Sequence, residues 1–183
     1  AARSLMSYLN KFEIETSYGI KAWKRWGNTA EQIIKSNPYV LCIQGVDLSF
    51  SRADAVAAKS DIPADSECRI KAGSTYILRQ NADQGHTCLP LDSLVKTAVS
   101  YLDVDEKLIK KVIEDETEEE NLYYYDKHGR RFVMLADFYK AEDYIARRLA
   151  IMRQISYDNK IDFSEVIDLE EENNGIQYEK IQR

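Results

Sequence analysis

The sequence predicts a mainly α-helical fold, in which tandem helix-hairpin-helix units are followed by a winged-helix-like α+β module with a small β-hairpin. Apolar residues recur at three- and four-residue intervals through most of the chain, which is the period of helices buried on one face. The first sixty residues repeat the order helix, short turn, helix, and two aromatic and β-branched runs later flank a turn at Gly129. We expect the hairpins in residues 1–62 and the winged-helix-like module, with a helix packed on it, in residues 63–155.

The first hairpin is predicted from two apolar stripes. One stripe defines a helix that ends near Lys11, and it comprises Leu5, Tyr8, Leu9 and Phe12. Thr16 or Ser17 can cap the second helix, and Gly27 can end it in the left-handed conformation that glycine adopts without strain. The expected buried edge of this second helix comprises Ile20, Trp23 and Trp26.

The second hairpin follows the same order. Asn28 and Glu31 resemble a capping box that opens a third helix, and Pro38 closes that helix. After an irregular stretch over residues 37–50, Ser51 and Asp54 repeat the capping-box pattern at the start of a fourth helix. Because four such short helices can bury their apolar faces only against each other, residues 1–62 are predicted to form two tandem hairpins.

The parts of a winged helix come next. Residues 68–83 suit a helix, residues 85–89 suit a short strand, and Pro90 begins another helix with apolar residues spaced three and four apart. Asp103 and Glu106 are expected to cap a further helix, which ends in an acidic run.

A β-hairpin and a last long helix complete the expected module. Residues 122–125 and 131–135 are predicted as strands, joined by a tight turn in which Gly129 supplies a positive φ. The helix over residues 138–154 is expected to pack across this wing, with inward residues Ala141, Tyr144, Ile145, Leu149 and Met152. Residues 156–175 are polar and acidic, which is typical of a linker.

The composition excludes several classes of protein. A hydrophobic content of 44% with 31% charged residues is ordinary for a globular domain, and the apolar stretches are too short to cross a membrane. The start lacks the apolar core of a signal peptide, so we expect a cytoplasmic protein with no membrane partner. Three cysteines with unequal spacing fit neither a disulfide framework nor a zinc site, and we expect free thiols and no metal.

The charge is distributed unevenly along the chain. The net charge is −6, but residues 1–60 carry +3, whereas residues 61–136 carry −5 and residues 137–183 carry −4. A phosphate backbone would be attracted to the first third and repelled by much of the rest. Any DNA contact should therefore be local and salt-sensitive.

The candidate DNA-binding residues are cations near the hairpins and the wing, together with one hydroxyl. Four lie on or before the second helix, two lie at the start of the fourth helix, and three lie at the wing tip: Lys11, Lys21, Lys24 and Arg25; Ser51 and Arg52; Lys127, Arg130 and Arg131. Each group also fits an ordinary solvated surface, and a salt bridge from Arg52 to Asp54 is an alternative for that arginine. Trp23 and Trp26 could stack bases, although their spacing favours core packing.

No nucleotide-hydrolysing site is present in the sequence itself. A Walker A loop needs two glycines five residues apart followed by Lys and Ser or Thr, and no pair among the seven glycines has that spacing. The segment is therefore expected to hydrolyse no ATP and to hold no cofactor by itself.

Several short motifs follow one another in a specific order: Phe12-Glu13-Ile14 through Trp26-Gly27, Asn37-Pro38-Tyr39, Phe50-Ser51-Arg52-Ala53-Asp54, Arg69-Ile70-Lys71-Ala72-Gly73, and Gly85-His86-Thr87-Cys88-Leu89-Pro90. In this order of motifs, from about Ser4 to Arg183, the chain resembles RecD-like ATP-dependent DNA helicases, the family of the exodeoxyribonuclease V alpha subunit. Residues 176–182 are similar to the glutamine-containing segment that precedes the phosphate loop of this family. Residues 156–183 would then be a linker and the start of a motor domain.

The resemblance implies a strand-handling role beside a motor. The parent protein would bind ATP and Mg²⁺, hydrolyse ATP, unwind DNA and take part in repair and recombination, with Gln182 contacting the adenine. The segment itself would hold DNA by its backbone and pack on its own downstream motor. Two alternatives stay open: a motor-less helix-hairpin-helix and winged-helix regulator or repair adaptor, and a protein-docking platform without DNA contact.

The hairpin turns depart from the family pattern. Helix-hairpin-helix turns use glycine so that backbone N–H groups can approach a phosphate. Glu13 stands at a glycine position in the first turn, and Asp47-Leu48-Ser49 replaces a glycine-hydrophobic-glycine run in the second turn. Two carboxylates at these places should repel phosphates.

Overall fold

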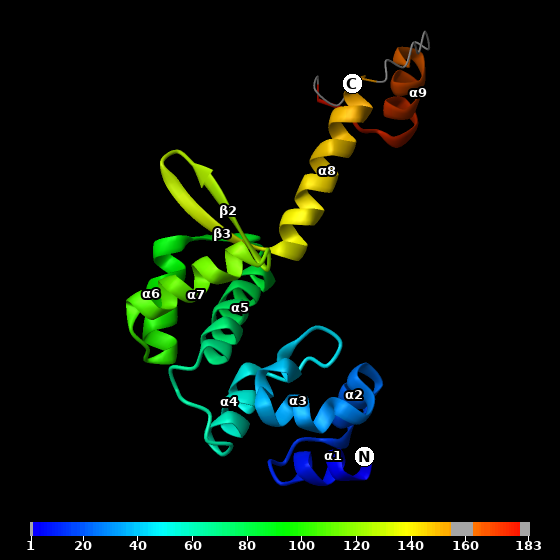
Figure 1. Cartoon of the computed structure of the whole chain (residues 1–183). Helices are drawn as coiled ribbons and strands as arrows, with labels where there is room; N and C mark the ends of the chain where they lie inside the picture. Colours follow the sequence, from blue (N-terminus) through cyan, green and yellow to red (C-terminus); the bar gives the residue numbers. More distant parts are fainter. Residues whose placement is uncertain (1, 155–162, 180–183) are drawn as a thin grey trace. The chain divides into compact units, whose positions relative to one another are not determined.

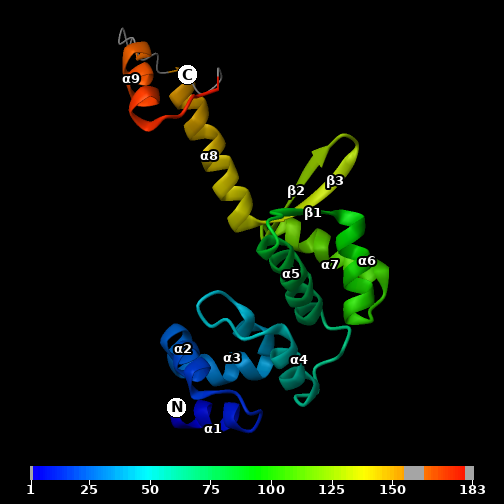
Figure 2. The same ribbon diagram turned by 180° about the vertical axis from the view of Figure 1, so that it is seen from behind.

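The structure is a computed structural model that describes residues 2–154 and 163–179 (Figure 1). It is mainly helical with one small three-stranded antiparallel sheet, which confirms the predicted fold class. The chain forms two compact units, Ala1–Asp143 and Tyr144–Arg183. In the first unit, helices α1 to α4 lie together at one end and the β-hairpin projects from the other end, as both views show (Figures 1 and 2).

The first hairpin consists of α1 (Ala2–Asn10) and α2 (Thr16–Trp26). Neither Thr16 nor Ser17 caps α2, because the cap position is occupied by Glu15. The prediction that Ile20 is buried is wrong, since its side chain is 46% exposed and Gly19 and Ala22 face the core instead. The two helices approach so closely that a Cβ on Gly19 would lie 3.2 Å from a methyl group of Leu9.

The second hairpin contains two short 3₁₀ turns that the sequence did not predict. Its elements are η1 (Gly27–Thr29), α3 (Ala30–Ser36), η2 (Pro38–Cys42) and α4 (Phe50–Ala58). The expected capping box at Asn28 is absent in this region, and Glu31 instead forms an ion pair of 2.7 Å with Lys35. Ser49 rather than Ser51 occupies the cap position of α4, so the second expected capping box is wrong as well.

The winged-helix-like module is built from three helices and three strands. They are α5 (Glu67–Asp83), β1 (Cys88–Pro90), α6 (Leu91–Leu102), α7 (Glu106–Glu118), β2 (Leu122–Lys127) and β3 (Arg130–Leu135). The sheet order is β1-β3-β2, with both pairs antiparallel. The cap of α7 is Asp105 and not Asp103, because the Asp105 side chain accepts hydrogen bonds from the Lys107 and Leu108 N–H groups.

Arg69 joins the hairpins to the winged-helix-like module. It donates to both carboxylate oxygens of Asp54, at 2.7 and 3.1 Å, and to the carbonyl oxygens of Ala64 and Leu102 at 2.7 and 2.8 Å. The Tyr39 hydroxyl donates to the same carboxylate. Asp54 therefore binds across this junction instead of capping α4.

A column of aromatic rings supports the same junction. The Phe50 ring lies between Tyr39 of η2 and Tyr76 of α5, with ring centroids 5.6 and 5.7 Å away. Tyr101 of α6 continues the column, 5.6 Å from Tyr76. Four elements from both parts of the first unit thus share one aromatic cluster.

The second unit contains most of α8 (Ala136–Gln154) and all of α9 (Ser164–Asn174). The expectation that α8 packs with an inward apolar stripe is wrong for Tyr144, Ile145, Leu149 and Met152, which are all more than half exposed. Residues 164–174 form a helix, although their acidic composition predicts a linker. Gly175 ends that helix in the left-handed conformation.

The close approach of α5 and α6 gives a first prediction. A Cβ on Gly73 would lie 2.6 Å from a methyl group of Leu102, which is itself buried. We expect Gly73→Ala to lower the free energy of unfolding by about 1–3 kcal/mol, because the overlap forces the two helices apart. Chemical denaturation measures the change, with Gln80→Ala on the exposed side of α5 as the control. Equal stability of the two variants would contradict this close packing.

The junction gives a second prediction, for acid stability. Burial alone would raise the pKa of Asp54, but the hydrogen bonds from Arg69 and Tyr39 outweigh burial and lower the pKa. A carboxyl with a lowered pKa stabilises the fold above its unfolded pKa of about 4, and this contribution is lost as the pH falls toward the lower folded value. We expect Asp54→Asn to flatten the dependence of unfolding free energy on pH below about pH 4.

The control for this titration is Asp65→Asn, since Asp65 is exposed and forms no ion pair within the described residues. If both variants kept the same acid slope as the parent chain, Asp54 would not be the group that couples folding to protons.

Candidate nucleic-acid interface

Three helix-to-helix turns share one local design. Each places an acidic residue at positive φ, then a buried aliphatic residue, then an extended residue at the cap position of the next helix. The triplets are Glu13-Ile14-Glu15, Asp47-Leu48-Ser49 and Asp103-Val104-Asp105. The φ values of the three acidic residues, 57°, 63° and 54°, lie in the region that favours glycine. The chain therefore keeps the turn shape of a helix-hairpin-helix motif without glycine at that position.

The helices after these turns differ in whether their first N–H groups are occupied. At α7, the Asp105 carboxylate accepts from two of them. At α2 and α4, the side chains at the cap positions, Glu15 and Ser49, accept no such hydrogen bond, and only their backbone carbonyl oxygens accept, from the third N–H group of each helix. Because uncapped N–H groups and the helix dipole attract anions, α2 and α4 have the arrangement that favours a phosphate, and α7 does not.

Two cations connect each hairpin to the turn of the other. Arg52 of α4 donates to the Glu13 carbonyl oxygen at 2.6 Å and to the Glu15 carboxylate at 3.3 Å. Lys21 of α2 donates to the Val46 carbonyl oxygen at 3.1 Å. These hydrogen bonds place the turns of the two hairpins beside the two helix starts.

The salt bridge to Asp54, the alternative given for Arg52, does not form, because Arg52 binds the first turn and Asp54 binds Arg69. Lys21 also lies 3.6 Å from the Asp47 carboxylate. The Tyr18 ring lies near both cations, 5.6 Å from the Lys21 ammonium and 5.7 Å from the Arg52 guanidinium. Both cations are thus partly neutralised where a phosphate would approach.

The other predicted cations of the hairpins are exposed. Lys11, Lys24 and Arg25 form no ion pair within the described residues, and Arg25 lies 5.8 Å from the Trp26 ring. Lys11 flanks the first turn, whereas Lys24 lies about 12 Å along α2 from its first residue. Ser51 is exposed near the start of α4, with its hydroxyl 3.4 Å from that of Ser49.

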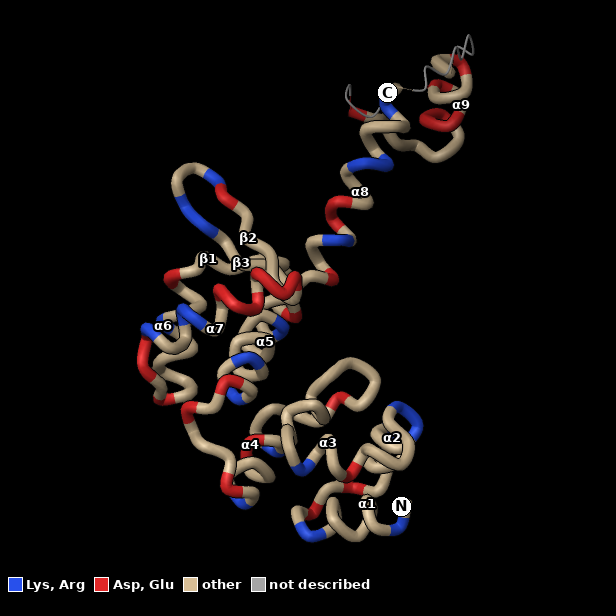
Figure 3. The backbone as a smooth tube through the Cα atoms, viewed as in Figure 1, with Lys and Arg blue, Asp and Glu red and all other residues tan. Residues whose placement is uncertain are grey.

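The predicted wing residues separate into two kinds. Lys127 and Arg130 face each other beside the turn of the β2–β3 hairpin and form no ion pair within the described residues. Arg131 binds both carboxylate oxygens of Asp126, at 3.0 and 3.3 Å, and lies 4.9 Å from the Tyr124 ring. The wing cations lie on a different element from the hairpin turns, at the other end of the unit (Figure 3).

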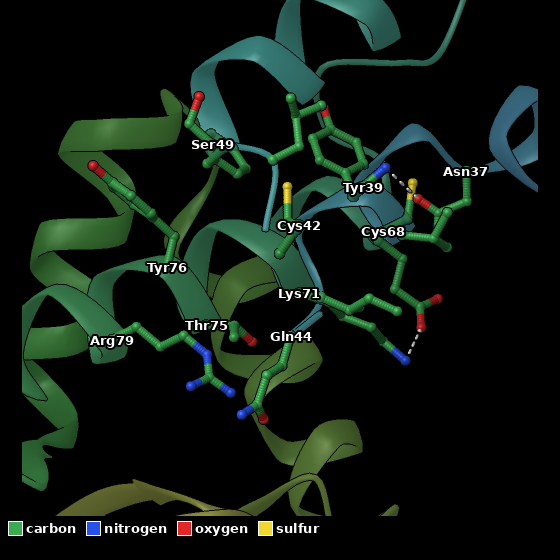
Figure 4. A pocket seen from close by; sticks show the side chains of 16 residues that line it. Asn37, Tyr39, Cys42, Gln44, Ser49, Cys68, Lys71, Thr75, Tyr76 and Arg79 are labelled. Carbon is green, nitrogen blue, oxygen red and sulfur yellow. Dashed lines mark hydrogen bonds and ion pairs between the residues drawn. The ribbon is translucent and has the colours of Figure 1, made fainter. Parts of the chain in front are cut away.

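A cavity of about 610 Å³ separates the second turn from α5 (Figure 4). Its walls include Cys42, Cys68, Tyr76 and the cation Arg79. All three cysteines are free thiols. Burial, with a smaller contribution from the Asp54 charge, raises the pKa of the Cys42 thiol to about 12, so this thiol stays protonated near neutral pH and is a poor nucleophile or metal ligand.

Two further features concern nucleotide and membrane binding. Gln182, the predicted adenine contact, lies outside the described residues. Within the described ranges 2–154 and 163–179, no cluster of His, Cys, Asp and Glu side chains is arranged to hold a metal ion. Over the same ranges, no helix combines the length and the apolar character needed to span a membrane.

The sequence did not predict that Asp105 caps the first N–H groups of α7, or that Asp54 binds Arg69. The repeated acid-aliphatic-cap triplet was a usable signal, because it marks the helix starts more accurately than the capping boxes do.

Comparison with protein families identifies the hairpin region. Residues 1–88 match the model of the helix-hairpin-helix domain of ATP-dependent RecD2 DNA helicases. The match covers both hairpins, α5 and the first residue of β1. It confirms the resemblance of this region to RecD-like helicases, and the starts of α2 and α4 lie within the matched residues.

The hydrogen bonds between the hairpins give a third prediction. Arg52→Ala removes the hydrogen bond to the Glu13 carbonyl oxygen and the ion pair with Glu15. We expect a loss of about 1–2 kcal/mol in unfolding free energy, because these interactions hold the first turn against α4. Lys24→Ala is the matched control, and thermal or chemical unfolding compares them. A loss no greater than that of the control would show that Arg52 contributes nothing to stability.

Proposed function

We propose that this chain holds DNA by its sugar–phosphate backbone, without reading base sequence, as the N-terminal strand-handling part of an ATP-dependent DNA helicase. The observation that carries the proposal is the pair of uncapped helix starts, held beside both hairpin turns by Arg52 and Lys21, within the region that matches the RecD2 helix-hairpin-helix domain.

The proposed interactions are electrostatic and local. The first N–H groups of α2 and α4 would donate to phosphate oxygens, and exposed cations such as Lys11, Lys24 and Arg25 would add attraction. The carboxylates of Glu13, Glu15 and Asp47 oppose this attraction, and Asp47 also accepts the Gly45 N–H at 3.0 Å. The balance of these charges favours weak binding that falls steeply with salt.

In this proposal, a motor domain outside this region hydrolyses the ATP that drives unwinding. Within the described residues, no pair of glycines has the spacing of a phosphate loop and no cluster of His, Cys, Asp and Glu is arranged to hold a metal, so the proposal places ATP and Mg²⁺ in the motor. ATP binding and hydrolysis, and any role in DNA repair or recombination in the cytoplasm, are assigned to a parent protein in which a motor follows this region.

Docking is the second candidate function, and one observation favours it. Ile145, Leu149 and Met152 are spaced four and three residues apart on α8 and are each more than half exposed. A row of apolar side chains with this spacing can bind the apolar face of another helix or domain, such as the motor region.

Charge reversal gives the fourth prediction. We expect Lys24→Glu combined with Arg25→Glu to lower the affinity for duplex DNA at low salt about fivefold or more. The slope of log affinity against log salt should decrease by about one for each phosphate that the variant no longer binds. Fluorescence anisotropy with DNAs of unrelated sequence provides both measurements.

The control carries the same change of charge elsewhere. Lys107→Glu combined with Lys111→Glu alters two exposed residues of α7 and should leave the affinity within about twofold of the parent chain. Equal losses in both double variants would indicate attraction by net charge alone. No loss in either variant, or no DNA binding by the parent chain, would reject the proposal and support docking.

A further inference from the structure

The register of the β-hairpin places two aromatic rings and two cations on one face of the wing. Residues directly opposite in an antiparallel pair share a face. Tyr125 is opposite Phe132, and Lys127 is opposite Arg130. The other face carries Leu122, Val133 and Leu135, which are buried in the core. We name the face formed by Tyr125, Lys127, Arg130 and Phe132 the outer wing face.

One ring on this side of the sheet is already covered by a parallel ring. Tyr123 precedes Tyr125 by two residues and therefore lies on the same side of the strand. The Tyr139 ring of α8 stacks on it, with centroids 4.1 Å apart and ring planes within 5° of parallel. The next ring, Tyr125, is 47% exposed, and no ring contact involving it is seen in the described residues. The Tyr139 ring thus stacks on Tyr123, and the exposed ring of Tyr125 offers a similar flat surface to another ring.

The charge of the outer wing face differs from that of its surroundings. Residues 61–136 carry a net charge of −5, yet Lys127 and Arg130, beside the hairpin turn, form no ion pair with a carboxylate in the described residues. Lys127 follows Tyr125 by two residues on β2, and Arg130 precedes Phe132 by two residues on β3. Aromatic rings for bases beside cations for phosphates are the pattern of surfaces that bind single strands without sequence preference.

We propose that the outer wing face binds single-stranded DNA by stacking an unpaired base on Tyr125, with Phe132 as the adjacent ring and with Lys127 and Arg130 contacting the flanking phosphates. Duplex DNA offers no such stacking partner, because its bases are stacked on each other. This inference goes beyond the backbone hold proposed for the hairpins and does not depend on it.

The test uses the whole chain and three labelled probes: a short oligothymidylate, a strand of the same length with abasic sites, and a duplex. We expect Tyr125→Leu to weaken binding to the oligothymidylate about fivefold or more, because an aliphatic side chain cannot replace a stacked ring. The same variant should bind the abasic strand and the duplex within about twofold of the parent chain. Tyr125→Phe keeps the ring and should restore binding to the oligothymidylate.

Two controls complete the experiment. Tyr144→Leu removes an even more exposed tyrosine, 63%, from α8 and should change no affinity for DNA. Lys127→Ala combined with Arg130→Ala should weaken binding to both the base-bearing and the abasic strand, because both carry phosphates. Circular dichroism establishes that each variant is folded.

Two results would overturn the proposal. One is an unchanged affinity of Tyr125→Leu for the oligothymidylate, and the other is an equal loss on the abasic strand, which would mean that no base is stacked. Failure of the hairpin proposal would be seen separately, as duplex binding that does not respond to reversal of Lys24 and Arg25.

Discussion

The rest of the first unit depends on the Arg69 guanidinium. Arg69 lies on α5, and its hydrogen bonds reach α4 through Asp54, the connecting segment through Ala64 and the end of α6 through Leu102. A guanidinium satisfies several acceptors at once because its donors are arranged in a fixed plane. Removal of this one side chain would leave a partly buried carboxylate without its cation. The helix-hairpin-helix region and the winged-helix-like module are thus joined by a polar interaction of defined geometry.

The junction determines how the two candidate DNA surfaces relate to each other. Helices α1 to α4 and the wing lie at opposite ends of the same compact unit (Figure 2). The aromatic column around Phe50 adds apolar area to the polar interaction and resists rotation of one part against the other. Under the proposed functions, a duplex and an unpaired strand would therefore be held at a separation that the fold fixes.

Local sequence patterns predicted the helices and the wing well, because the apolar period and the turn residues are local properties. His128 and Gly129 both adopt positive φ, as a tight hairpin requires, and the strands begin and end close to the expected residues. Interactions between distant residues were not predictable in this way. The partner of Asp54 lies fifteen residues away on another helix, and Ile20 is exposed because glycine at position 19 lets α1 approach. The candidate cations were found from charge alone, but only the structure shows that Arg52 and Lys21 are already bound.

The acidic residues at positive φ have a consequence for how tightly the hairpin turns would bind a DNA phosphate. A glycine in such a turn leaves the backbone bare and lets a phosphate settle against it, whereas Glu13 and Asp47 keep the same curvature with a negative group in front. A phosphate that approaches would be attracted by the N–H groups at the start of α2 or α4 and repelled by the carboxylate of Glu13 or Asp47. Under the proposed function, these opposing forces would make the contact with each phosphate short-lived, which suits a domain that binds and releases DNA repeatedly beside a moving motor.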